Sequence, residues 1–294
     1  PVSVLAACVM ARLKVRAWIS SIIVSLTWLA SLYSTYDERT EFDVEISTKA
    51  YRKQWNEVWK MAENAPDGYF LGTFYRNLCL ARRGQLPQHL LEYHQYPDAG
   101  MSIRVEPGMN LMVAFSSIDQ LLEVGDISQA TGCALLGQTA MPNGNSSHLL
   151  RRLTELAMVS GEYNVAGKYL DLLSATLFHR KWALEMKECL ATGRLTEELR
   201  RYRSITSQTD RLYYQNDAIG AGRSILAGNP RGQSAVDYLL CSYLLGKNVN
   251  SFCAAFEHYY MGRFVSADDV PELYQEALLV NVNSEESFRS TVVR

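Results

Sequence analysis

Apolar side chains recur every three or four positions along most of the chain after residue 45, and strict alternation of apolar and polar residues is scarce. In the segment 48–65, Tyr51, Trp55 and Val58 fall on one face of a helix. Arg52 and Lys60 fall on the opposite face. The spacing predicts an all-α fold, with one amphipathic helix over this segment.

Five glycines interrupt the helical pattern, each after an apolar run and before a short polar step. They are Gly84, Gly125, Gly161, Gly193 and Gly246, separated by 41, 36, 32 and 53 residues. Glycine reaches the positive φ of a helix C-terminal cap at little cost, so each one predicts a turn between two helices. Residues 46–282 are therefore predicted to form two-helix repeats, an α-solenoid of about ten helices, with irregular stretches over 94–108 and 204–233. A frayed tail is expected over 283–294.

The segment 17–36 contains twenty consecutive residues without a charge. As a helix it would be about 30 Å long at roughly 1.5 Å per residue, which matches the hydrocarbon thickness of a bilayer. Trp18, Tyr33 and Tyr36 lie near its ends, where aromatic rings favour the headgroup level. We therefore expect a transmembrane helix over 15–36 rather than a cleaved signal peptide, whose apolar core is shorter.

Charges on either side of this segment predict its orientation. Residues 12–16 hold three basic residues, whereas residues 37–45 hold five acidic residues and one Arg. Basic flanks stay in the cytoplasm, so the helical domain is expected in the periplasm, anchored to the inner membrane. The apolar residues 1–11 are interpreted as the stub of a preceding transmembrane helix in a multi-spanning parent.

Residues that carry chemistry are sparse. Lys and Arg number 29 against 31 Asp and Glu, a formal charge of -2, so no excess of positive charge favours nucleic acid. The six cysteines form no Cys-x-x-Cys pair, and the five histidines never stand at metal-ligand spacing. Neither a nucleophile elbow nor a phosphate-binding loop occurs. We therefore predict no enzyme activity, no cofactor, and no catalytic, cofactor-binding or metal-ligating residue.

One stretch resembles a known repeat. Gly161, Tyr163, Ala166, Tyr169 and Leu170 look like the inter-helix turn and second helix of a tetratricopeptide repeat. The resemblance implies degenerate two-helix repeats, since other stretches match the repeat less well.

A wider order of features is similar to a Bacteroidota family of multi-spanning membrane proteins of unknown function. The features are the spanning segment, Tyr51 with Trp55, and the stretches 77–81, 172–183 and 274–280. The resemblance implies a tetratricopeptide-like C-terminal domain behind membrane helices, and it brings no catalytic residues.

The Tyr and Arg residues of the predicted repeats suggest a surface that binds a protein or peptide. Stacked helix pairs create a concave surface, and Tyr and Arg are favoured at interface cores. The predicted partner-binding groove consists of Arg82, Arg83, Arg151, Arg152, Tyr163 and Tyr169. We expect a membrane-anchored scaffold that binds a protein or peptide outside the cytoplasm. The alternative is an accessory domain of a multi-spanning membrane enzyme or transporter whose active part lies in further N-terminal helices.

Overall fold

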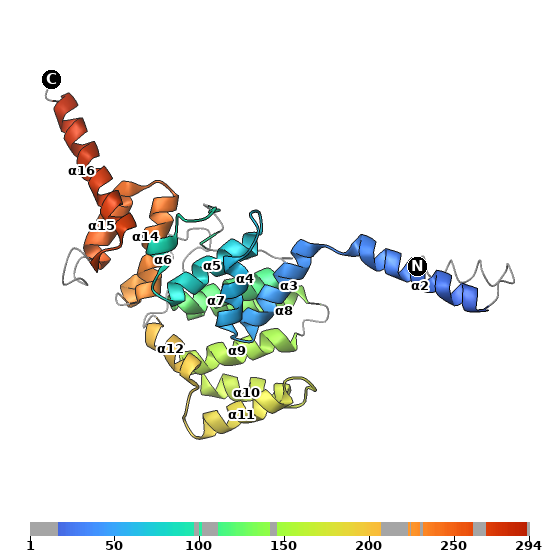
Figure 1. Cartoon of the computed structure of the whole chain (residues 1–294). Coiled ribbons are helices and arrows are strands. Elements are labelled where there is room, and N and C mark those ends of the chain that lie inside the picture. The colour runs from blue at the N-terminus through green and yellow to red at the C-terminus, as the bar shows by residue number, and fades with distance from the viewer. Residues whose placement is uncertain are drawn as a thin grey trace. The chain divides into compact units, whose positions relative to one another are not determined.

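The computed structural model describes residues 17–96, 100–101, 111–141, 146–206, 223, 225–229, 232–260 and 269–292 (Figure 1). The regular elements of this part are α-helices, and it contains no β-strand, which confirms the all-α prediction. The predicted stub over 1–11 and the basic residues of 12–16 lie outside the described residues.

The chain divides into two units, residues 1–44 and 45–294. In the first unit, α2 (Ala17–Thr35) coincides with the uncharged segment, and α3 (Glu38–Tyr51) begins after it. Across the described residues, none of the helices is both long and apolar enough to cross a membrane.

The second unit consists of helices joined mostly by short connections. Their bounds are α4 (Trp55–Glu63), α5 (Phe70–Arg82), α6 (Leu86–His89), α7 (Leu111–Val124), α8 (Ile127–Ala140), α9 (Ser147–Ser160), α10 (Tyr163–Ser174), α11 (Arg180–Ala191), α12 (Glu197–Ile205), α14 (Gln233–Leu245), α15 (Val249–Tyr259) and α16 (Glu272–Val292). The last of these includes residues 283–292 of the predicted tail.

Neighbouring helices pack side by side in sequence order from α7 to α11, as do α4 with α5, α14 with α15, and α15 with α16 (Figure 1). Later helices also pack against early ones. Helix α12 packs against α7 and α9, α14 packs against α5, α6 and α7, and α16 packs against α6. Neighbour contacts alone therefore do not hold the unit together, because these helices join segments that are distant in sequence.

Most of the predicted glycine turns are present. Gly84, Gly125, Gly161 and Gly193 all have positive φ, between 66° and 88°. Gly246 is different: its φ is -76°, and Lys247 takes the left-handed conformation with φ 55°. Gly125 has a second reason to be glycine, because a Cβ there would lie 2.1 Å from the carbonyl oxygen of Ile205.

The prediction of one continuous helix over 48–65 was wrong. Helix α3 ends at Tyr51 and α4 begins at Trp55. Between them Lys53 adopts a φ of 61°, with its N–H donating to the carbonyl of Ala50 at 2.9 Å. A lysine at a left-handed position leaves no turn signal in the sequence, where Gly or Asn is usual.

The main core lies among α7 to α12. Ile118 and Leu122 of α7 pack in one cluster with Leu156 of α9, and all three are buried. Helix α8 contributes small buried residues, among them Ala130 and Ala134, which allow close approach of its neighbours. This packing fixes the positions of the polar residues that α7 and α9 also carry.

Candidate functional site

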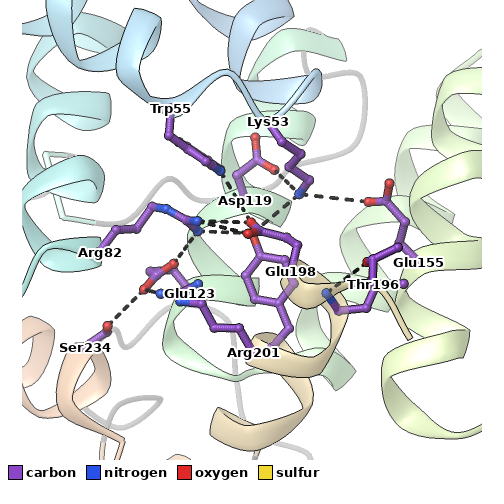
Figure 2. A network of polar contacts seen from close by, with 12 residues as sticks. Lys53, Trp55, Arg82, Asp119, Glu123, Glu155, Thr196, Glu198, Arg201 and Ser234 are labelled. Carbon is purple, nitrogen blue, oxygen red and sulfur yellow. Dashed lines mark hydrogen bonds and ion pairs between the residues drawn. The ribbon is translucent and has the colours of Figure 1, made fainter. Parts of the chain in front are cut away.

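A network of charged side chains lies inside the second unit, and we call it the central charge network; Figure 2 shows part of it. It joins five cations to four carboxylates, from the α3–α4 turn and helices α5, α7, α9 and α12. Its members are Lys53, Arg82, Arg151, Arg152 and Arg201 with Asp119, Glu123, Glu155 and Glu198.

Arg152 of α9 is the most deeply placed cation of the network. Its side chain has no exposed surface, and its guanidinium donates to Asp119 and to Glu155, both at 2.7 Å. Burial opposes the charge on Arg152, but the two carboxylates outweigh that effect and raise its pKa. For Glu155, burial raises the pKa while Arg152 and Lys53 lower it, and the result is a pKa of about 2. Both groups are therefore ionised at neutral pH.

Lys53 reaches the same carboxylates from the α3–α4 turn. Its Nζ lies 3.9 Å from Asp119 Oδ1 and 3.9 Å from Glu155 Oε2, and its side chain is 20% exposed. Burial and the nearby charge of Arg152 lower the pKa of Lys53 to about 8. The amine is therefore still largely protonated at neutral pH, although it binds its proton less tightly than an ordinary lysine does.

Glu123 of α7 gathers three donors from three other helices. Arg82 of α5 donates to it at 2.7 Å, Ser234 of α14 donates at 3.0 Å, and Arg201 of α12 forms a further ion pair (Figure 2). The Glu123 side chain has no exposed surface. One carboxylate thus ties α5, α12 and α14 to α7.

Arg82 also connects the network to Glu198 of α12. It donates to Glu198 at 3.0 Å and to the hydroxyl of Tyr202 at 3.2 Å, and Tyr202 donates to Glu198 at 2.7 Å. Burial raises the pKa of Glu198, but Arg82 and the Tyr202 hydroxyl reverse the effect, so that the pKa is lowered. Burial raises the pKa of Arg82's neighbour Tyr202, which stays a neutral donor.

Aromatic rings cover the outer cations. The Arg82 guanidinium lies 4.1 Å from the centre of the Trp55 ring. Arg151 lies 4.5 Å from the Trp182 ring and 5.1 Å from the Tyr51 ring. Such cation–π contacts stabilise the charges while shielding them from water.

Three polar atoms of the network make no hydrogen bond with any described residue: Asp119 Oδ2, Arg152 Nε and Arg201 Nη1. They belong to side chains whose other atoms are paired. Within the described ranges, no group of three or more His, Cys, Asp or Glu side chains is placed to hold a metal ion.

The structure places the six residues predicted to line a binding groove in different surroundings. Arg82, Arg151 and Arg152 belong to the central charge network, where Arg152 is fully buried. Arg83 is exposed and lies over the Trp59 ring at 4.3 Å. Tyr163 is 45% exposed and accepts a hydrogen bond from Arg203 at 2.8 Å, whereas Tyr169 packs against the core. Whether any of them binds a partner stays a prediction.

The carboxylates of the network were not predicted as site residues from the sequence. Glu197 and Glu198 share one charged helix start, but only Glu198 enters the network. Asp119 and Glu123 stand four residues apart within the largely apolar α7. Two acids on one face of an apolar helix could have indicated the network, because carboxylates that are buried with such a helix need cationic partners.

Comparison with known proteins identifies a family. A family model described as "Family of unknown function (DUF6057)" matches residues 1–291. No curated protein and no solved structure matched the chain. Function must therefore be inferred from the residues of this chain.

Proposed function

The chain belongs to this family of unknown function, and we propose that it is a membrane-attached, tetratricopeptide-like scaffold that binds a protein or peptide and catalyses no reaction. In this proposal α2 attaches the chain to the inner membrane, and the second unit lies in the periplasm.

The observation that carries the proposal is the internal pairing of the central charge network. Each of its four carboxylates lies within 3.0 Å of an arginine of the same chain. A general acid, base or nucleophile must instead be able to reach a substrate. Charges paired in this way suit the bracing of a rigid binding surface.

The turn and helices that resemble a tetratricopeptide repeat support the repeat interpretation. Helix α9 ends at Ser160 and is capped by Gly161, whose φ is 88°, and α10 begins two residues after this glycine. Ala166 and Leu170, two of the residues that carry the resemblance, are fully buried. Tyr163 is left partly exposed at the start of α10, where a ligand can contact it.

The side chains of α2 support membrane attachment. Trp18, Leu26, Trp28 and Leu29 are each between 58% and 61% exposed. The hydroxyl of Thr27 donates to the carbonyl of Ile23 at 3.0 Å, as hydroxyl groups do in an apolar solvent. A bilayer would cover the apolar side chains while these hydroxyls stay satisfied within the helix.

Alkaline extraction of membranes tests the attachment. The full-length chain is expected to stay with the membrane, and the Ile22→Ser/Leu26→Ser/Leu29→Ser variant is expected to move to the supernatant. The matched control, Val44→Ser/Leu91→Ser/Leu135→Ser, also replaces three exposed apolar residues and should remain attached. Release of the wild-type chain, or retention of the α2 variant, would contradict the proposal.

A photoreactive amino acid in place of Tyr163 tests the scaffold function. We expect it to capture one discrete protein, whose affinity for the purified chain falls at least about tenfold in Arg83→Ala/Tyr163→Ala. Lys60→Ala, an exposed substitution on α4, should leave the affinity unchanged. Turnover of a small molecule by the purified chain, without a saturable protein partner, would oppose this function.

A further inference from the structure

The hairpin formed by α10 and α11 exposes large apolar side chains where its two helices are joined. Leu177 is 84% exposed and Phe178 is 88% exposed, within the short connection between the helices. Leu172 of α10 and Leu184 of α11 are 59% and 51% exposed. We call these four residues the hairpin tip. Clustered apolar residues on a protein surface mark a site of interaction.

The connection that carries the hairpin tip is held by its own polar contacts. The Thr176 hydroxyl donates to the carbonyl of Leu173 at 2.7 Å, and the N–H of His179 donates to the same hydroxyl at 3.3 Å. His179 is buried, and its ring packs against His148 of α9 with centroids 4.9 Å apart. Leu177 and Phe178 therefore project from an ordered turn that is anchored on α9.

Positive charge lies next to the two most exposed side chains of the hairpin tip, Leu177 and Phe178. Arg180 and Lys181, both exposed, follow them closely in the sequence. The nearest acids in the sequence, Asp171 and Glu185, adjoin Leu172 and Leu184, and Asp171 pairs with Lys187 at 2.7 Å. Two apolar side chains beside two cations match the boundary of an anionic bilayer, where acyl chains lie beneath phosphate groups. A second copy of the chain fits less well, because a symmetric dimer through this tip would bring like charges together.

We propose that the hairpin tip inserts Leu177 and Phe178 into the headgroup boundary of an anionic membrane, with Arg180 and Lys181 on the lipid phosphates. This inference rests on the proposed membrane attachment and adds a second contact that would orient the helical unit on the bilayer.

The test places the fluorescent amino acid dansylalanine at Phe178, at Leu29 of α2, or at Leu91 as a control, each in the full-length chain. Leu91 is also well exposed, at 64%, but lies outside the hairpin tip. The three proteins are reconstituted in vesicles of phosphatidylcholine alone or with phosphatidylglycerol, and brominated lipids serve as quenchers. We expect blue-shifted, quenched emission at position 178 on the anionic vesicles, and none at position 91.

Variants separate charge from apolar insertion. Arg180→Glu/Lys181→Glu is expected to weaken insertion of position 178 at least about tenfold, since each cation near an anionic surface contributes about fivefold. In a chain labelled at position 184, Leu177→Ser/Phe178→Ser should abolish quenching, while Leu135→Ser should leave it unchanged. These residues are exposed, so the variants are expected to keep the wild-type melting temperature.

Quenching at position 29 without quenching at position 178 would overturn this inference and leave the membrane attachment standing. Absence of quenching at both positions would overturn both. A blue shift at position 178 that needs no lipid and grows with protein concentration would indicate contact between copies, and would also overturn it.

Discussion

Arg152 illustrates, at the scale of single residues, how this domain accommodates charge in its interior. An unpaired guanidinium in the core would be strongly disfavoured. Two carboxylates at 2.7 Å compensate, and removing one partner of such a buried pair typically costs about 3–5 kcal/mol. The pairs are therefore better understood as fixing one arrangement of α7 and α9 than as a large net source of stability.

His148 and His179, whose rings meet edge to face, give a prediction about pH. Burial lowers the pKa of both His148 and His179, and Arg151 lowers each of them further. Their pKa values in the folded chain thus lie below about 6.5, the value for an unfolded chain. The unfolded chain then binds more protons, so stability is complete above about pH 6.5 and decreases as the pH falls through the folded pKa values.

We expect the melting temperature of the wild-type chain to fall between pH 7 and pH 5, and that of His148→Phe/His179→Phe to fall less. Thermal unfolding followed by circular dichroism measures both. The control is His258→Phe, which replaces an exposed histidine and should keep the wild-type slope. Identical slopes in all three proteins would show that protonation of His148 and His179 does not lower the stability.

At the scale of elements, the turns differ in how much they depend on glycine. Gly161 and Gly125 both have positive φ, 88° and 84°. A Cβ at Gly161 would meet open space, whereas at Gly125 it would collide with the backbone of Ile205. The turn at Gly161 therefore requires glycine only for its positive φ. The turn at Gly125 also requires it because α12 leaves no room for a Cβ.

Alanine substitution should separate these two requirements. Gly161→Ala is expected to lower the free energy of unfolding by about 1 kcal/mol, from the left-handed backbone alone. Gly125→Ala is expected to lower it by about 3 kcal/mol, because the end of α12 must also shift. Urea denaturation of both variants measures the difference. Equal losses would mean that α12 does not approach Gly125 as closely as described.

At the scale of the whole molecule, Glu123 connects helices that are distant in sequence. Arg82 lies 41 residues before it, Arg201 lies 78 residues after it and Ser234 lies 111 residues after it. Because these donors come from α5, α12 and α14, the carboxylate couples the stability of those helices.

Glu123→Gln should therefore loosen several helices at once. We expect the free energy of unfolding to fall by about 3 kcal/mol, since two guanidinium groups lose a charged partner in the interior. Hydrogen exchange should become faster in both α5 and α12. Glu57→Gln removes an exposed pair with Lys60 and should change stability by no more than about 0.5 kcal/mol. Faster exchange confined to α7 would argue against the coupling.

The sequence by itself determined those features that depend on residues close together in the chain. Helical periodicity and glycine at positive φ depend on residues a few positions apart, so the all-α fold and the turns at Gly84, Gly125, Gly161 and Gly193 could be predicted. The break between α3 and α4 at Lys53 could not be predicted. The left-handed conformation of Lys53 places its amine beside Asp119 and Glu155, which belong to helices distant in sequence.

Only the tertiary structure decided which charges are buried. Arg82 and Arg83 are adjacent and alike in the sequence, yet Arg82 pairs with Glu123 and Glu198 while Arg83 stays exposed. Glu198 lies 116 residues from Arg82, a separation that no local pattern encodes. The return of α12 and α14 to α7 brings these groups together, because a buried charge needs a partner that only the packing of distant helices can supply.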